Sequence, residues 1–120
     1  MTGIDRISAE RQRQMSSEGW TAEHDDMHDG AELALAAVCY AANAAGEHVY
    51  LKRVHEYQNE STVTFSDPWP WHRKWDKRPT GTPSTQERIR ALEKSGALIA
   101  AEIDRLLRQS SPTPSSTKEQ

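Results

Sequence analysis

The most regular apolar pattern lies near the end of the chain, where apolar positions recur at alternating steps of three and four residues. The pattern comprises Ile89, Leu92, Gly96, Ile99, Ile103 and Leu106. These steps keep side chains on one side of a helix, so they predict a long amphipathic helix. Ser84 and Glu87 have the spacing of a capping box at its start. Because glycine costs about 1 kcal/mol relative to alanine inside a helix, we expect Gly96 to allow a close contact with another helix.

An alanine-rich stretch, residues 30–45, is apolar on most sides, which is typical of a helix buried between neighbours. Alanine lets neighbouring backbones approach closely, so this helix is the expected partner of Gly96. Gly46 is placed to end the helix, and Gly30 disfavours its extension towards the N-terminus. Residues 21–27 are therefore expected to form a separate short turn.

The start of the chain, residues 4–17, is polar and rich in helix formers. It predicts a helix with a thin apolar edge, which needs another element to lean on. Gly19 is placed to end this helix, and Trp20 is the first bulky anchor after it. The edge comprises Ile4, Ile7, Arg11 and Met15.

The middle of the chain changes character over residues 47–66, which contain β-favouring side chains on both sides of a turn-forming stretch, residues 58–61. A small β-hairpin is predicted, although a helix over residues 47–57 fits nearly as well. The prolines of residues 67–83 lack a backbone donor and restrain the residues before them. We therefore expect a Trp- and Pro-rich loop there.

Together these elements predict a mainly α protein. We expect one small three-helix domain over residues 1–109, carrying the Trp/Pro loop and, if residues 47–66 pair as strands, a short β-hairpin. A polar tail over residues 110–120 has nothing to bury and is expected to be disordered. Hydrophobic residues make up only 35% of the 120 residues, so the core is small. Small helical cores are commonly completed across a dimer interface, and we therefore expect a homo-oligomer.

The charge is unevenly distributed. The net charge is −3, yet residues 1–47 carry nine acidic and three basic residues, whereas residues 48–120 carry twelve basic and nine acidic ones. The two parts should attract each other in the folded protein. An acidic chain without a long basic run lacks the clustered positive surface that duplex nucleic acid requires. Duplex nucleic acid is therefore not an expected partner.

The apolar content also bears on location. No apolar run approaches the roughly 20 residues that span a bilayer, so no membrane association is expected. The single cysteine, Cys39, lies among apolar residues of a predicted helix and is interpreted as a core residue. A lone buried thiol fits a reducing compartment, so we expect a cytoplasmic protein.

A cluster of histidines and acids precedes the alanine-rich helix. A continuous helix would place His24, His28 and Glu32 on one stripe, a ligand set suited to zinc or manganese, beside the pair Asp25 and Asp29, which suits magnesium. The alternative is that the acids cap a helix while the histidines are exposed or bond to backbone.

The tryptophans of the loop alternate with cations. Such a mixture resembles a surface that stacks on the bases and contacts the phosphates of a nucleotide or single strand. The alternative is that the tryptophans close the open end of the three-helix core. The candidate ligand-binding residues are Trp69, Trp71, His72, Arg73, Lys74 and Trp75.

Three segments together, AERQRQMSSEGWTAEHDDMHDGAELALAAVCYA, PWPW and LEKSGALIAAEIDRLLR, resemble a family of small proteins encoded by tailed phages and prophages. The likeness covers most of residues 4–46 and 67–108. It implies a phage accessory protein in the host cytoplasm. Such a protein would act without catalysis, by binding a host protein or a nucleotide-like ligand and thereby modulating host defence.

A second resemblance is to the all-α nucleoside triphosphate pyrophosphohydrolases, in which glutamate-rich helices hold magnesium. Residues 29–34, DGAELA, are similar to the first motif of those enzymes, and Glu102 with Asp104 would stand in for the second at a different spacing. This resemblance implies the alternative function, a nucleotide hydrolase that depends on a divalent metal such as Mg, Mn or Zn. The sequence therefore leaves open whether the protein is an enzyme.

Overall fold

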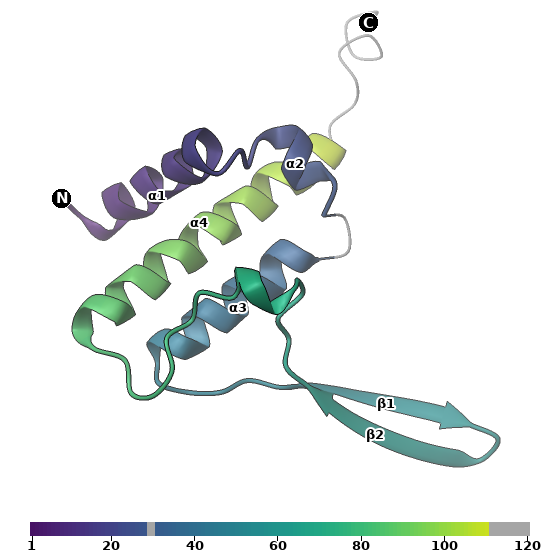
Figure 1. The fold of residues 1–120 in the computed structure, drawn as a ribbon. Helices are drawn as coiled ribbons and strands as arrows, with labels where there is room; N and C mark the ends of the chain where they lie inside the picture. Colours follow the sequence, from purple (N-terminus) through teal and green to yellow (C-terminus); the bar gives the residue numbers. More distant parts are fainter. Residues whose placement is uncertain (29–30, 111–120) are drawn as a thin grey trace, which may run out of the picture.

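The computed structural model describes residues 1–28 and 31–110. Three long helices lie side by side, with α4 (Thr85–Ser110) between α1 (Gly3–Ser17) and α3 (Glu32–Ala44), as Figure 1 shows. The α4 helix packs on both neighbours. The prediction of a mainly α protein with three principal helices is confirmed.

The connection between α1 and α3 contains the predicted break. Gly19 has a φ of 70°, a left-handed conformation that glycine adopts without strain, and it ends the first helical segment. The short helix α2 (Ala22–Asp26) follows and lies against α4. Its N-terminus is capped by Thr21, whose hydroxyl accepts the N–H of His24 at 3.3 Å. Because α3 begins only at Glu32, the alanine-rich helix is separate, as predicted.

The core lies between α3 and α4 and is built mainly of small side chains, which let the two backbones approach closely. The Ser95 hydroxyl donates a hydrogen bond to the Ala37 carbonyl at 2.8 Å across this contact. Cys39 is buried, as predicted, and burial raises the pKa of its thiol to about 11. The core residues are Leu33, Ala36, Ala37, Tyr40, Ala44, Ala91, Leu98 and Ala101.

The face that α4 turns to the core differs from the predicted one. The large apolar residues of the predicted stripe are about half exposed: Leu92 51%, Ile99 48%, Ile103 51% and Leu106 47%. The buried face instead carries Ala91, Ser95, Leu98, Ala101 and Arg105. The smaller residues fit against the alanine-rich α3, and the larger ones are left on the outer side. The predicted partner of Gly96 is also wrong, because Ile7 of α1 covers this glycine.

The predicted apolar edge of α1 forms only part of its buried face. Ile7 packs on Gly96 and Arg11 is buried, but Ile4 is 80% exposed, and Glu10 and Gln14, outside the edge, are buried. The apolar edge is too thin to define the packing, and ion pairs make burial of the polar side chains possible. This helix therefore brings charge to the interior.

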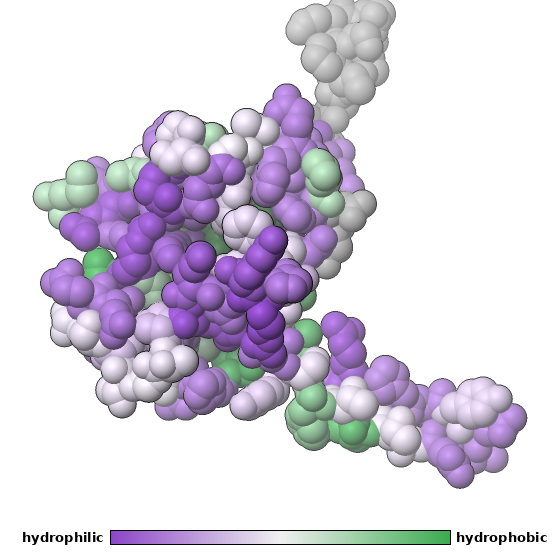
Figure 2. All heavy atoms as spheres, in the orientation of Figure 1, coloured by the Kyte–Doolittle hydropathy of each residue, from purple (hydrophilic) through white to green (hydrophobic). Residues whose placement is uncertain are grey.

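Residues 47–66 contain the predicted hairpin, so the helical alternative is wrong. Strands β1 (Leu51–Tyr57) and β2 (Glu60–Ser66) are antiparallel, with Val54 opposite Val63. The two turn residues, 58 and 59, both have positive φ, as in the two-residue turns that match strand twist. The hairpin projects away from the helices (Figure 1), and its hydrophobic residues gather on the half nearer the helical body (Figure 2).

Residues 67–84 cross α3 as the predicted loop (Figure 1), with one 3₁₀ turn, η1 (Arg73–Trp75). Trp69 and Trp71 are partly buried against the core. The tail predicted over residues 110–120 lies outside the described residues from 111 onwards, and Ser110 still belongs to α4. None of the helices in the described residues combines the length and apolarity required to cross a membrane.

Candidate ligand-binding pocket

A cavity of about 810 Å³ lies between the loop and the layer of helices. Its walls come from α1, α2, α3, α4 and the loop, so no single stretch of the sequence contains it. This volume falls within the range of about 300–1,000 Å³ that is typical of small-molecule sites. The aromatic part of its lining comprises Trp20, His24, His28, Tyr40, Trp69, Trp71, His72 and Trp75.

The aromatic rings contact one another in a continuous series centred on Trp71. The centroid of the Trp71 ring lies 5.5 Å from Trp69, 6.2 Å from Trp20 and 5.2 Å from His28. The series continues from Trp69 to Tyr40 at 5.7 Å, with the two rings edge to face. Aromatic pairs at these separations attract each other beyond the effect of buried area. The pocket therefore has a wall of mutually supporting flat rings.

Ion pairs hold the aromatic loop in place. The Arg78 guanidinium contacts Asp76 at 2.7 Å and Asp67 at 3.2 Å, and it lies 5.4 Å from the centre of the Trp69 ring. Burial opposes the charged form of Asp67, but the N–H of Trp69 and the charge of Arg78 outweigh it and lower the pKa of this carboxyl. The loop is also joined to α3 through Asn43, whose amide donates to the Pro79 carbonyl at 3.1 Å. The ring wall is thus pre-formed.

Another part of the lining is charged and includes Glu10, which is only 4% exposed. Its carboxylate accepts hydrogen bonds from Arg13 at 2.8 Å and from Arg90 at 2.6 Å. Although burial opposes ionisation, these two guanidinium groups lower the pKa of Glu10 to about 2. Arg13 also bonds to Glu18 at the pocket edge. Both carboxylates in the described lining are therefore already paired.

Three buried polar atoms of the lining residues have no hydrogen-bond partner among the described residues. They are Oε1 of Gln14, on α1, Nδ1 of His24, on α2, and Nε1 of Trp71, in the loop. The Gln14 side chain is only 2% exposed, and its amide nitrogen donates to Glu10 at 3.2 Å. Buried polar groups are nearly always satisfied in folded proteins. Unsatisfied groups at a cavity are consistent with a binding site.

The break between α2 and α3 interrupts the continuous helix that the predicted metal set assumed, but His24 and His28 remain adjacent, with ring centroids 4.9 Å apart. Asp25 is fully buried and pairs with Arg11 at 2.8 Å, and the His24 ring stacks on Trp20 at 5.8 Å. His28 lies against Trp71, with its Nδ1 3.8 Å from Glu32. Within residues 1–28 and 31–110, no three His, Cys, Asp or Glu side chains are arranged to hold a metal ion. Asp29 lies outside the described residues, so a site that uses it stays a prediction.

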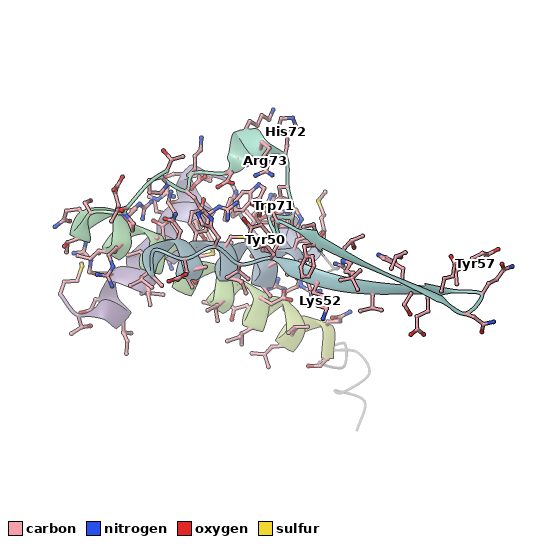
Figure 3. All side chains as sticks on the ribbon, turned by 90° about the horizontal axis from the view of Figure 1, so that it is seen from below. Tyr50, Lys52, Tyr57, Trp71, His72 and Arg73 are labelled. Atoms are coloured by element: carbon pink, nitrogen blue, oxygen red, sulfur yellow. The ribbon has the colours of Figure 1, made fainter. Side chains whose placement is uncertain are left out.

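The predicted ligand-binding residues divide into two groups. Trp69, Trp71, His72 and Trp75 line the pocket, whereas Arg73 and Lys74 do not. Figure 3 shows Trp71 nearer the helices than the outer turn that carries His72 and Arg73. Arg73 contacts Asp67 at 3.5 Å, and the Lys74 ammonium lies 5.1 Å from the Trp75 ring. Trp69 and Trp71 pack on the core, as the structural interpretation predicts, and they also line the cavity, where ligand binding stays a prediction.

Sequence reasoning missed the contributions of α1 and α4 to the pocket. Glu10 and Arg90 are 80 positions apart, and nothing near either residue indicates their contact. Glu102, which the hydrolase resemblance would place on a metal, instead accepts a hydrogen bond from Arg105 at 2.7 Å. The lining residues missed are Glu10, Arg13, Gln14, Glu18, Trp20, Leu33, Tyr40, Arg90, Lys94 and Leu98, whereas Lys77 belongs to the cations that alternate with the tryptophans in the sequence.

Neither a protein-family model, nor a curated protein, nor a solved structure matches the chain. The functional argument therefore depends on the geometry of the pocket.

Proposed function

We propose that the protein is a non-enzymatic binding protein that holds a small ligand with a flat aromatic ring system, as in a nucleotide. The observation that carries this proposal is the cavity of about 810 Å³ beside the ring series centred on Trp71. Stacking of a base on an aromatic side chain contributes about 1–3 kcal/mol per base. Ion pairs pre-organise the loop, so binding orders few groups and costs little conformational entropy.

Binding is favoured over hydrolysis by the state of the carboxylates. Glu10 and Glu18 are the acidic side chains in the described lining, and Arg13 donates hydrogen bonds to both. A carboxyl group with a pKa near 2 is a weak general base at neutral pH. The resemblance to small phage proteins suggests the setting, the host cytoplasm, where holding such a ligand would modulate host defence.

Isothermal titration calorimetry with a panel of nucleotides tests the proposal. The unmodified protein should bind at least one member. Trp71→Ala should weaken that binding by about tenfold or more through lost stacking. Tyr57→Ala is the matched control, because this aromatic side chain is 73% exposed at the tip of the hairpin (Figure 3) and should leave affinity unchanged. Circular dichroism checks that both variants are folded.

Two results would count against the proposal. Failure of the whole panel to bind would remove its basis. Chromatography of the nucleotide after incubation with Mg²⁺, Mn²⁺ or Zn²⁺ addresses the alternative, because metal-dependent turnover would establish a hydrolase. Recovery of intact ligand is the expected result.

We also propose that the protein is a homo-oligomer in which a second copy covers the outer face of α4. Leu92 and Lys94 are two residues apart on this helix, so they point about 200° apart, and Lys94 lines the pocket. The half-exposed stripe that contains Leu92 therefore faces away from the pocket. The stripe consists of Leu92, Ile99, Ile103 and Leu106, with steps of seven, four and three residues. These steps match the heptad spacing of helices that pair as coiled coils.

A further inference from the structure

The charges of the pocket do not cancel. Among the described residues, four cations and two carboxylates line the pocket, and both carboxylates form ion pairs with arginines. Arg90 also forms an ion pair with Glu93 at 3.1 Å. Lys77 and Lys94, by contrast, form no ion pair within the described part of the chain. The uncompensated charge of the pocket is therefore positive and belongs to two lysines.

Lys94 is placed unfavourably for an ammonium group without a counter-ion. It projects from α4 beside Arg90, is only partly exposed, and has its Nζ 5.4 Å from the centre of the Tyr40 ring. Burial, together with the nearby charge of Arg90, lowers the pKa of Lys94. A partly desolvated charge is costly unless it is paired. An anion bound beside it would compensate this cost.

Lys77 reaches the same end of the pocket from the loop. Its backbone N–H donates to the Tyr40 hydroxyl at 3.3 Å, and both lysines also line a smaller cavity of about 160 Å³ that adjoins Tyr40. Arg90 and Glu87 line this smaller cavity too, and the Glu87 carboxylate accepts the backbone N–H of Ser84 at 2.9 Å. The ring series leads from Tyr40 through Trp69 to Trp71. The pocket thus has a cationic end at Tyr40 and an aromatic end at Trp71.

We infer, building on the proposed function, that the ligand is an anionic aromatic molecule whose phosphate lies between Lys94 and Lys77 while its ring stacks at Trp71. The alternative occupant of an aromatic pocket is a quaternary ammonium, which aromatic rings attract through cation–π interactions. Uncompensated lysines repel such a cation. The charge of the pocket therefore selects a nucleotide over a choline-like ligand.

A nucleoside and its monophosphate, titrated separately by calorimetry, measure the contribution of the phosphate. The unmodified protein should bind AMP about tenfold or more tightly than adenosine, because charge-assisted hydrogen bonds are the strong ones. Lys94→Gln should reduce this ratio several-fold, because only Lys77 then remains beside the phosphate, while leaving the affinity for adenosine unchanged. Lys52→Gln is the matched control, since it removes an exposed lysine of β1, outside the pocket lining, and should preserve the ratio. If other bases are preferred, the corresponding pair replaces adenosine and AMP.

Equal affinity of the unmodified protein for the nucleoside and the monophosphate would overturn the inference. An equal loss of affinity for the two ligands in Lys94→Gln would also overturn it. Tighter binding of choline than of AMP would also overturn it. A second measurement separates this inference from the proposed function. Pyrophosphate alone, at matched ionic strength, should raise the melting temperature of the unmodified protein and of Lys52→Gln, and should raise that of Lys94→Gln by clearly less.

The two measurements give distinct failures. Stabilisation by pyrophosphate without binding of any nucleoside or nucleotide would support the anion subsite and contradict the proposed aromatic-ligand function. Binding of nucleosides without any effect of phosphate or pyrophosphate would support the aromatic-ligand function and contradict the anion subsite.

Discussion

Asp25 and Asp26 are neighbours in α2 with opposite surroundings. Asp25 is fully buried and pairs with Arg11, itself only 8% exposed, whereas Asp26 is at the surface and pairs with Arg108. Removing one partner of a buried pair leaves an uncompensated charge and typically costs about 3–5 kcal/mol. We therefore predict that Asp25→Ala lowers the free energy of unfolding by about this amount, measured by urea denaturation.

Asp26→Ala serves as the control, because exposed ion pairs contribute little. Its unfolding curve should nearly match that of the unmodified protein. Similar losses in both variants would show that Asp25 has no special structural role.

Glu10 provides a prediction about pH. The folded-state pKa of about 2 lies below the ordinary value of 4.5, so folding favours the ionised carboxylate. The resulting stabilisation is complete above pH 4.5 and is lost as pH falls towards 2. Unfolding free energy, measured across this window, should fall more steeply with decreasing pH in the unmodified protein than in Glu10→Gln. Parallel curves for the two proteins would contradict the assignment of the low pKa to Glu10.

At the scale of elements, α1 packs tightly against α4 at Gly96. A Cβ added there would lie 2.6 Å from Cδ1 and 2.8 Å from Cγ1 of Ile7. Alanine gains about 1 kcal/mol of helix propensity over glycine, but overpacking typically costs about 1–3 kcal/mol. We predict that Gly96→Ala lowers the melting temperature in the unmodified background and raises it in an Ile7→Ala background. The same sign of change in both backgrounds would show that Ile7 does not restrict this position.

Secondary structure was largely predictable because its signals are local. Gly19 and Gly46 both have positive φ, and each lies just beyond a helix end where the sequence places a glycine stop. The turn of the hairpin lies at residues 58 and 59, within the predicted turn. The buried face of α4 was not predictable from apolar periodicity. Against an alanine-rich neighbour, close backbone approach at Ala91 and Ser95 prevailed over the burial of larger side chains.

The pocket was only partly predictable for a related reason. The tryptophan-rich loop is recognisable in the sequence. The residues that complete the pocket, however, depend on which faces of α1 and α4 turn inward. The buried Glu10 carboxylate is compensated by both Arg13 and Arg90, and these arginines come from different helices. Local patterns cannot show that arrangement. The continuous helix expected through His24, His28 and Glu32 is interrupted before Glu32, and the role of these residues as metal ligands stays a prediction.

At the scale of the whole molecule, one side of the helical layer is covered by the tryptophan loop and the outer face of α4 is not. Ile99 is at the centre of the half-exposed stripe on this face, between Leu92 and Leu106. An antiparallel pairing of two α4 helices about Ile99 would place Leu92 of one copy near Leu106 of the other. Apolar patches of this kind on soluble proteins commonly mark interaction sites. We therefore predict a dimer in sedimentation velocity.

Ile99→Glu should convert this dimer to a monomer, because two carboxylates would meet at the symmetry axis without partners. Ile4→Glu is the control, since this residue is 80% exposed on α1 and should leave the dimer intact. Ligand affinity should survive Ile99→Glu, because the stripe faces away from Lys94 and the pocket. A monomer in the unmodified protein at about 100 µM would exclude self-association at an affinity useful in a cell. Loss of ligand binding along with the dimer would instead show that the two faces of α4 depend on each other.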